Sequence, residues 1–379
     1  MKIGIMTFWW SNDNYGQLLQ CYALQKYLRC AGHDAYLIRY DSRKDQNRYL
    51  LSRILMVFNP VKLIAYIKVK IKKYLSKREQ LKYNREFENF RNEHICCSER
   101  IYYSYEELKK NPPDADMYIT GSDQVWSLQN NSSIRAYFLD FGDSNIKRIS
   151  YAASFGKDKL DNRYIKKITP LLQNFDYISV REKSGLAICK QCGVDNAEWV
   201  PDPTILLDIE KYRNLYKDKT IIKPDKSYCF LYILGFESKF SIQNIYDWVK
   251  QKKLEVIYIT GSSQHDKYEK YYATIPEWIY LLEHAEYVIT NSFHCSVFSI
   301  LFQKQFAVIP LAKNLINKNT RLDSLFELFE IKNRFINADI SVIDIEINWE
   351  RVSAIIKNLK NLCKLNNVIS MKESGKLKS

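Results

Sequence analysis

Glycine is scarce in this sequence, with 11 residues in 379. The first apolar run leads into Phe8-Trp9-Trp10 and not into a glycine-rich turn, and neither G-x-G-x-x-G nor G-x-x-x-x-G-K-[ST] occurs anywhere. Dinucleotide and P-loop sites need glycines where the backbone approaches phosphate, so both classes of site lose support. The sequence also lacks any run of 18 uncharged apolar residues, which argues against a membrane-spanning helix.

The nine cysteines lack the regular spacing of a disulfide framework, and no signal peptide opens the chain. Cys189-Lys190-Gln191-Cys192 is a lone C-x-x-C with no second pair at zinc-like spacing, so a structural role is favoured for it. We therefore expect a cytoplasmic enzyme that needs neither a metal nor a cofactor.

Short apolar stretches alternate with longer helical ones, a pattern typical of parallel sheets covered by helices on both faces. The expected strands span residues 2–8, 35–40, 117–120, 148–154, 177–180, 228–234, 255–260, 287–290 and 306–309. Proline-containing breakers lie between the two groups of strands. The sequence thus predicts two Rossmann-like, doubly wound α/β domains that face a cleft, over residues 1–210 and 211–345, followed by a C-terminal helix and tail over 346–379.

Positive charge is concentrated in one segment. The chain has 57 Lys and Arg against 43 Asp and Glu, a net charge of +14. Residues 43–91 hold fourteen basic and four acidic residues, so this segment carries +10 of the net charge of +14. Apolar residues such as Ile64, Ile67 and Ile71 are interleaved, so we expect a basic amphipathic helical insertion at about 43–95. Such a helix either lies on an anionic membrane surface, here the inner face, or packs on its own domain. No nucleic-acid partner is expected, because no binding module accompanies it.

Among the five histidines, only His294 follows a buried strand directly. A helix of small and apolar residues begins there, so the imidazole should face the cleft beside backbone N–H groups that favour an anion. The alternative is a histidine that caps the helix or bonds across the domain interface. Arg181 also ends a strand and either grips a carboxylate or phosphate or pairs with Glu182. The loop Gly121-Ser122-Asp123-Gln124 is either a ligand-binding loop or simply a turn.

Together these pieces resemble the polysaccharide pyruvyl transferase family. The matching stretches are Asn14-Tyr15-Gly16-Gln17-Leu18-Leu19-Gln20, Ile119-Thr120-Gly121-Ser122-Asp123-Gln124-Val125-Trp126, Ser150-Tyr151-Ala152-Ala153-Ser154-Phe155-Gly156, Ile178-Ser179-Val180-Arg181-Glu182, Val200-Pro201-Asp202-Pro203-Thr204 and Thr290-Asn291-Ser292-Phe293-His294. They run in order from the first strand to about residue 330 and leave out the basic insertion.

The resemblance implies a GT-B-like fold, phosphoenolpyruvate as donor, and a pyruvate ketal formed on a sugar of a bacterial capsule or exopolysaccharide precursor. A lipid-linked oligosaccharide is the implied acceptor. His294 corresponds to the proposed catalytic histidine and Arg181 to a donor-binding arginine. Family members often carry an arginine where this chain has Ser292, so another cation such as Arg321 is expected to contact the donor. The full set of expected donor-binding residues is Arg181, Ser292, Phe293, Arg321, Gly121 and Ser122. The expected acceptor-binding residues are Asn14, Tyr15, Gln17, Asp123 and Asp202.

Two other functions stay open at this point. A nucleotide-sugar glycosyltransferase of GT-B architecture would use the same cleft for a diphosphate donor. A non-catalytic homologue would bind glycan or membrane through the basic helix.

Overall fold

A computed structural model describes residues 1–41, 83–127, 134–221, 223–234, 240–261, 266–310, 319–337, 339–363 and 365–370, with isolated positions at 64, 66, 67, 71, 74 and 78. Most of the basic insertion predicted at 43–95 therefore lies outside the described residues.

The first domain is built on a parallel sheet with strand order β3-β2-β1-β4-β5. Its strands are β1 (Lys2–Met6), β2 (Asp34–Tyr40), β3 (Cys97–Tyr102), β4 (Met117–Thr120) and β5 (Lys147–Ser150). Isolated parallel bridges continue from β5 to the short pair β6 (Ser179–Val180) and β7 (Glu198–Trp199). The order reverses between β1 and β4, which makes their carboxyl ends the switch point of a doubly wound sheet.

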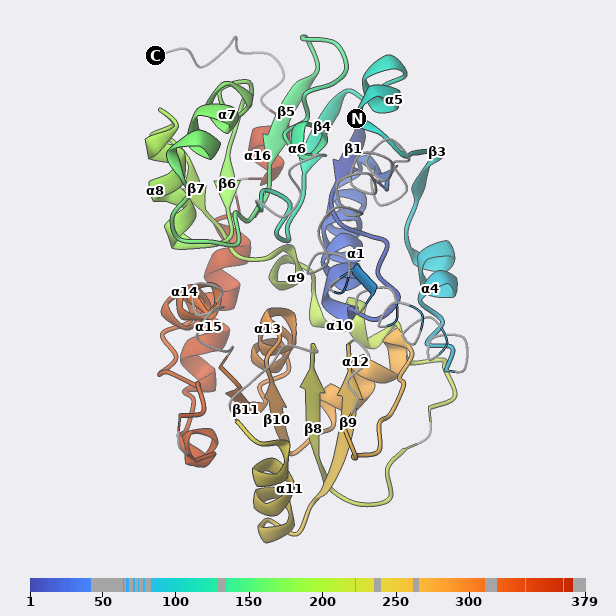
Figure 1. Ribbon diagram of the computed structural model, residues 1–379, viewed down its shortest axis with the longest axis vertical. Coiled ribbons are helices and arrows are strands. Elements are labelled where there is room, and N and C mark those ends of the chain that lie inside the picture. Colours follow the sequence, from blue (N-terminus) through green and yellow to red (C-terminus); the bar gives the residue numbers. More distant parts are fainter. Residues whose placement is uncertain are drawn as a thin grey trace.

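The second domain holds a four-stranded parallel sheet in the order β11-β10-β8-β9 (Figure 1). Its strands are β8 (Tyr228–Ile233), β9 (Glu255–Thr260), β10 (Tyr287–Thr290) and β11 (Gln305–Val308). The order reverses between β8 and β10, so this sheet has a switch point of its own. Two doubly wound α/β domains are thus confirmed, with strands close to the expected positions and with β3 and β7 as additions.

Helices flank both sheets. In the first domain they are α1 (Tyr15–Cys30), α4 (Phe87–His94), α5 (Tyr105–Lys110), α6 (Ile134–Tyr137), α7 (Asn162–Leu172) and α8 (Lys183–Gln191). The two short helices α9 (Pro203–Leu206) and α10 (Ile209–Arg213) lie between the domains (Figure 1). In the second domain they are α11 (Ile242–Gln251), α12 (Ile275–Glu283), α13 (Phe293–Leu301), α14 (Thr320–Leu328) and the 3-10 helix η4 (Ser341–Asp344).

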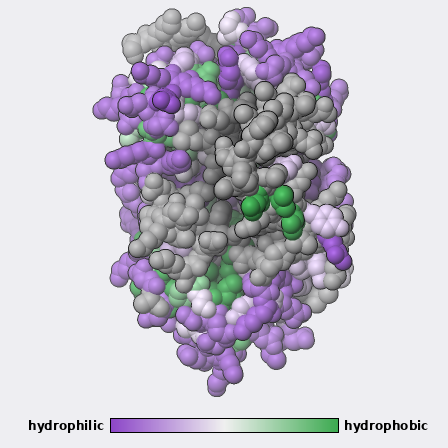
Figure 2. Space-filling model, viewed as in Figure 1, coloured by the Kyte–Doolittle hydropathy of each residue, from purple (hydrophilic) through white to green (hydrophobic). Residues whose placement is uncertain are grey.

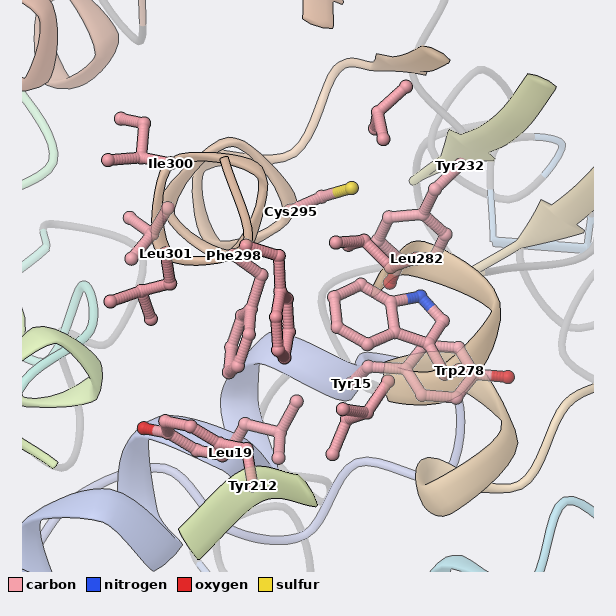
Figure 3. Close-up of a cluster of buried hydrophobic side chains, with 14 of the residues drawn as sticks. Tyr15, Leu19, Tyr212, Tyr232, Trp278, Leu282, Cys295, Phe298, Ile300 and Leu301 are labelled. Atoms are coloured by element: carbon pink, nitrogen blue, oxygen red, sulfur yellow. The ribbon is translucent and has the colours of Figure 1, made fainter. Parts of the chain in front are cut away.

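A shared hydrophobic core joins the domains. Tyr15 and Leu19 of α1 meet Trp278 of α12 and Phe298 of α13 (Figure 3). Tyr15 stacks on Trp278 with ring centroids 5.3 Å apart, and its hydroxyl donates to the Ala273 carbonyl at 2.6 Å. Burial of large aromatic rings on both sides of the boundary stabilises one arrangement of the two domains.

The end of the chain returns to the first domain. Helix α15 (Trp349–Asn361) runs back from the second domain, and α16 (Leu365–Ser370) lies beside the first sheet (Figure 1). Leu365 and Ile369 pack in the same buried cluster as Ile3 and Ile5 of β1. The predicted C-terminal helix is therefore two helices, and the second of them covers the first domain.

The described end of the basic segment ties the domains together at one side. Arg85 donates to the Thr260 carbonyl at 2.7 Å, and Tyr83 stacks on Tyr272 at 4.0 Å. Among the described helices, none has both the length and the hydropathy that crossing a membrane requires. On the face shown in Figure 2, hydrophobic residues form small separate patches among hydrophilic ones.

Candidate active site

A pocket of about 210 Å³ lies where the two switch points face each other. From the first domain, Asp13 and Asn14 follow β1, and Asp123 and Gln124 follow β4. From the second domain the pocket is lined by Leu234, Gly261, Asn291, Ser292, Phe293, His294 and Arg321. This is the place where open α/β sheets bind ligands, here with both sheets contributing.

The amino terminus of α13 points at this pocket. Ser292 is its N-cap, and the Ser292 side chain accepts from the Cys295 backbone N–H at 3.3 Å. The N–H groups of Phe293 and His294 lie in the first turn, which an α-helix leaves without partners of its own. Those donors and the helix dipole favour an anion at this end of the pocket.

His294 lines the pocket but is only 6% exposed. One side of its imidazole lies against Gly16 of α1, where even a methyl group would come within 2.5 Å of the His294 Cβ and Cγ atoms. Gly16 is therefore the residue that lets α1 and α13 approach so closely. Nε2 is buried and has no hydrogen-bond partner among the described residues, but it lies 3.4 Å from Asp202 Oδ2.

Asp202 is the centre of a buried polar network behind the pocket. Its Oδ2 accepts from Ser122 Oγ at 2.7 Å and from Arg181 Nη1 at 3.2 Å. Its Oδ1 caps α9 by accepting from the Thr204 N–H and hydroxyl at 3.1 and 2.7 Å. Burial alone would raise the pKa of Asp202, but the attraction of His294 and Arg181 and the Ser122 hydrogen bond lower it. The carboxyl group is therefore ionised.

Arg181 does not line the pocket. Its side chain is 1% exposed; Nε donates to Glu182 at 3.1 Å, and the guanidinium stacks on the Phe293 ring at 4.4 Å. Burial opposes the charge, yet Glu182 and Asp202 outweigh it and raise the pKa of Arg181. Arg181, expected to contact the donor, thus lies behind the pocket wall, where it contacts Phe293 and Asp202.

Arg321 is the arginine that reaches the pocket. Its guanidinium lies 6.0 Å from the Phe293 ring, and the Gln124 amide oxygen, in the orientation that hydrogen bonding favours, accepts from its Nη1 at 3.0 Å. Burial and the nearby Arg181 charge lower the pKa of Arg321 to about 10. A bound anion would relieve this repulsion between two cations, so Arg321 is suited to hold one.

Asp123 occupies an unusual backbone conformation, with φ at +81°. Left-handed backbone is costly for a residue with a side chain, although aspartate tolerates it better than most. The Asp123 carboxylate accepts from the Gln124 N–H at 2.8 Å, which helps to hold the turn. The strained turn places Asp123 in the pocket wall.

Half of the expected site residues line the pocket and half do not. Those in the lining are Asn14, Asp123, Ser292, Phe293, His294 and Arg321. Tyr15 is fully buried in the interdomain core, and burial raises its pKa. Gln17 accepts from the Ser11 N–H at 2.9 Å. Gly121 packs on Thr7 and Leu24, and Ser122 is bound to the buried carboxylate.

Five lining residues were not among the expected ones: Asp13, Gln124, Leu234, Gly261 and Asn291. Each directly follows a strand or neighbours an expected site residue, so position at strand ends would have found them. The described residues contain no group of three or more His, Cys, Asp or Glu side chains placed to hold a metal ion.

Comparison with protein families gives one match. The model for polysaccharide pyruvyl transferases matches residues 14–312, most of the chain. The chain belongs to this family. It is therefore a pyruvyl transferase of polysaccharide synthesis, and the matched region includes every pocket residue except Asp13 and Arg321. Comparison with curated proteins gave no match.

Solved structures resemble the chain only broadly. UDP-GlcNAc 2-epimerase of Methanocaldococcus jannaschii aligns at 11% identity over 95% of this chain and 100% of its own, with a TM-score of 0.49. The Neisseria meningitidis UDP-GlcNAc 2-epimerase aligns at 11% identity over 99% and 95% of the two chains, with a TM-score of 0.45. The glycosyltransferase SnogD of Streptomyces nogalater aligns at 11% identity over 95% of each chain, with a TM-score of 0.40.

Proposed function

We propose that this pyruvyl transferase takes its pyruvyl group from phosphoenolpyruvate and forms a pyruvate ketal on a sugar. The observation that carries the proposal is the pocket end made by His294, Arg321 and the α13 amino terminus. It combines one titratable side chain with fixed donors for an anion. Phosphoenolpyruvate offers a carboxylate and a phosphate to such donors and a basic enol carbon to an acid.

The reaction balances with one proton carrier. Protonated His294 gives its proton to the methylene carbon of phosphoenolpyruvate, and a sugar hydroxyl attacks C2 and returns a proton to the imidazole. Phosphate then leaves C2 with the electron pair of the C–O bond. A second hydroxyl of the same sugar attacks C2 to close the ketal, and its proton leaves with the phosphate. A positioned general acid contributes about 10²–10⁴-fold to such a step.

The roles of the other lining residues follow from their chemistry. Arg321 and the α13 N–H groups hold the donor's anionic groups, while Asn14 and Asp123, on the opposite wall, offer hydrogen bonds to acceptor hydroxyls. The scheme uses no metal or cofactor, and the absence of both from the reaction remains a prediction.

The test uses His294→Ala, with His284→Ala as a matched control at an exposed histidine outside the pocket. Purified protein is incubated with phosphoenolpyruvate and a lipid-linked glycan extract, and phosphate release and the mass gain of a pyruvate ketal are followed. We expect the wild type and the control to form product and His294→Ala to lose about 10²-fold or more in kcat. Equal product from His294→Ala would refute the role of the imidazole. Thermal stabilisation by UDP- or GDP-sugars but not by phosphoenolpyruvate would favour a glycosyltransferase.

We further propose that the acceptor is a lipid-linked precursor of a capsule or exopolysaccharide, met at the cytoplasmic face of the membrane. Four exposed apolar residues of this segment have the spacing of one helical face. They are Ile64 (56% exposed), Ile67 (47%), Ile71 (54%) and Tyr74 (65%). Basic residues surround them in the sequence. An apolar stripe with flanking positive charge favours an anionic bilayer, by about 1 kcal/mol for each basic residue near the surface.

Sedimentation with vesicles tests this surface. We expect binding to vesicles that contain anionic lipid, weaker binding at high salt, and little binding to zwitterionic vesicles. Charge reversal at Lys68, Lys70 and Lys72 should release the protein, whereas reversal at Lys109 and Lys110 of α5 should not. Unchanged binding by the first variant would remove the membrane proposal and leave the pyruvyl transfer intact.

A further inference from the structure

The interaction between Asp202 and His294 crosses the domain boundary. Asp202 stands at the amino end of α9, and His294 stands in the first turn of α13 in the second domain. The Asp202 side chain is fully buried and the His294 side chain is 8% exposed, so water does not compete for the contact. Asp202 Oδ2 and His294 Nε2 are 3.4 Å apart, so the carboxylate faces this nitrogen directly.

Asp202, expected to bind acceptor hydroxyls, is 1% exposed and lies outside the pocket lining. Its two oxygens are divided instead. Oδ1 belongs to α9, through Thr204, while Oδ2 receives Ser122, Arg181 and the approach of Nε2. Oδ2 therefore faces the His294 imidazole, and Oδ1 faces the amino terminus of α9.

We propose that Asp202 is a positioning residue that orients the His294 ring through its contact with Nε2. This inference rests on the proposed function. Gly16 makes the opposing wall, so the ring is held between α1 and the carboxylate. The remaining charged groups around the ring are Arg181 behind Asp202, and Asp13, Asp123 and Arg321 around the pocket.

A consequence concerns the two domains. Because the carboxylate and the imidazole belong to different domains, the contact exists only at the separation that the interdomain core sets. A larger separation of the two domains would break the contact between Asp202 Oδ2 and His294 Nε2. The contact therefore depends on the packing of the two domains against each other.

Asp202→Asn is the discriminating variant, because the amide keeps an oxygen for the α9 cap while it removes the charge and replaces Oδ2, the acceptor of the Ser122 and Arg181 hydrogen bonds, by a donor. We expect kcat to fall about 10²-fold with a smaller change in KM for phosphoenolpyruvate. The dependence of kcat on pH should differ from that of the wild type, since the ring loses the buried carboxylate that contacts it. In a His294→Ala background, Asp202→Asn should cost nothing more, because the residue acts through the histidine.

Two controls guard against loss of structure. Asp161→Asn changes another capping aspartate, at α7 and outside the pocket, and should leave kcat and the pH profile unchanged. Ser122→Ala keeps the Asp202 charge and removes one hydrogen bond, so it should shift the profile in the same direction by less. An Asp202→Asn loss that adds fully to that of His294→Ala, or an unmoved pH profile, overturns the inference.

A measurement without substrate separates this inference from the proposed function. The imidazole ¹⁵N shifts of His294, assigned by comparison with His294→Gln, should change on Asp202→Asn and not on Asp161→Asn. Unchanged shifts overturn the positioning role whatever the reaction. If the ¹⁵N shifts change but the protein does not turn over phosphoenolpyruvate, the proposed donor is refuted and the positioning role stands.

Discussion

Gly16→Ala is the substitution for which the structure makes the sharpest forecast. In an ordinary helix this change stabilises by roughly 0.5–1 kcal/mol, because glycine loses more backbone freedom on folding than alanine. At this position the new methyl group would lie within 2.5 Å of His294 Cβ and Cγ. Cβ is fixed to the backbone of α13, so no change of rotamer relieves the overlap. The two helices must move apart.

The magnitude follows from these opposing effects. Overpacking costs about 1–3 kcal/mol, which offsets and exceeds the helix gain, so we expect a net loss of roughly 1–2 kcal/mol in unfolding free energy. Activity should suffer more, because displacing a catalytic group by about 1 Å can cost about 10²-fold. Separating α1 from α13 also moves His294 relative to Asp202, which belongs to the first domain.

Urea unfolding and pyruvyl transfer are measured on the same preparation. Gly121→Ala is the comparison, since its added carbon would meet only the Thr7 and Leu24 side chains at 3.1 and 3.2 Å, a smaller adjustment. A Gly16→Ala protein that is more stable than wild type and fully active would refute the close contact between the two helices.

Three further outcomes are expected. Tyr15→Phe should cost about 1–3 kcal/mol, because it leaves the buried Ala273 carbonyl unpaired, and thermal melts should show this while KM for the acceptor stays unchanged. Arg321→Gln should raise KM for phosphoenolpyruvate by about 10–100-fold in steady-state assays, and in the wild type KM should rise above a pH of about 10, where the Arg321 pKa lies. The pKa of Asp202 is lowered on folding, so its stabilisation is complete above an unfolded value of about 3.9 and is lost as the pH falls further. Melts of wild type and Asp202→Asn should therefore converge in acid, and a constant difference would contradict the ionised state.

The domain architecture could be predicted because buried parallel strands are continuous apolar runs. Expected strands at 117–120, 255–260 and 287–290 have the same bounds in the structure. The strand β3 was missed because its sequence, CSERIY, is largely polar, as suits an edge strand with a partly exposed face. β7 has only two residues and gives no run to recognise. Sequence patterns thus identify strands that form apolar runs, the edge strand β9 included, and miss those that are polar or very short.

Strand ends also located the pocket, since the carboxyl ends of parallel strands meet at one edge of a sheet. What they could not give is the direction of each side chain. Arg181 follows β6 as Asp123 follows β4, yet Arg181 turns inward to two carboxylates while Asp123 is held outward by a left-handed turn. No local pattern distinguishes these outcomes, because each depends on partners that are distant in sequence.

The pairing of Asp202 with His294 shows why such partners matter to function. One of the Asp202 oxygens, Oδ1, caps the short helix α9 by accepting from the Thr204 N–H. The other oxygen gains its role only when the second domain brings His294 to it. Burying the Asp202 carboxylate costs free energy unless neighbouring groups stabilise its charge. Arg181 already supplies part of that stabilisation. The additional approach of an imidazole that also lines the pocket is what connects the buried network with the proposed acid.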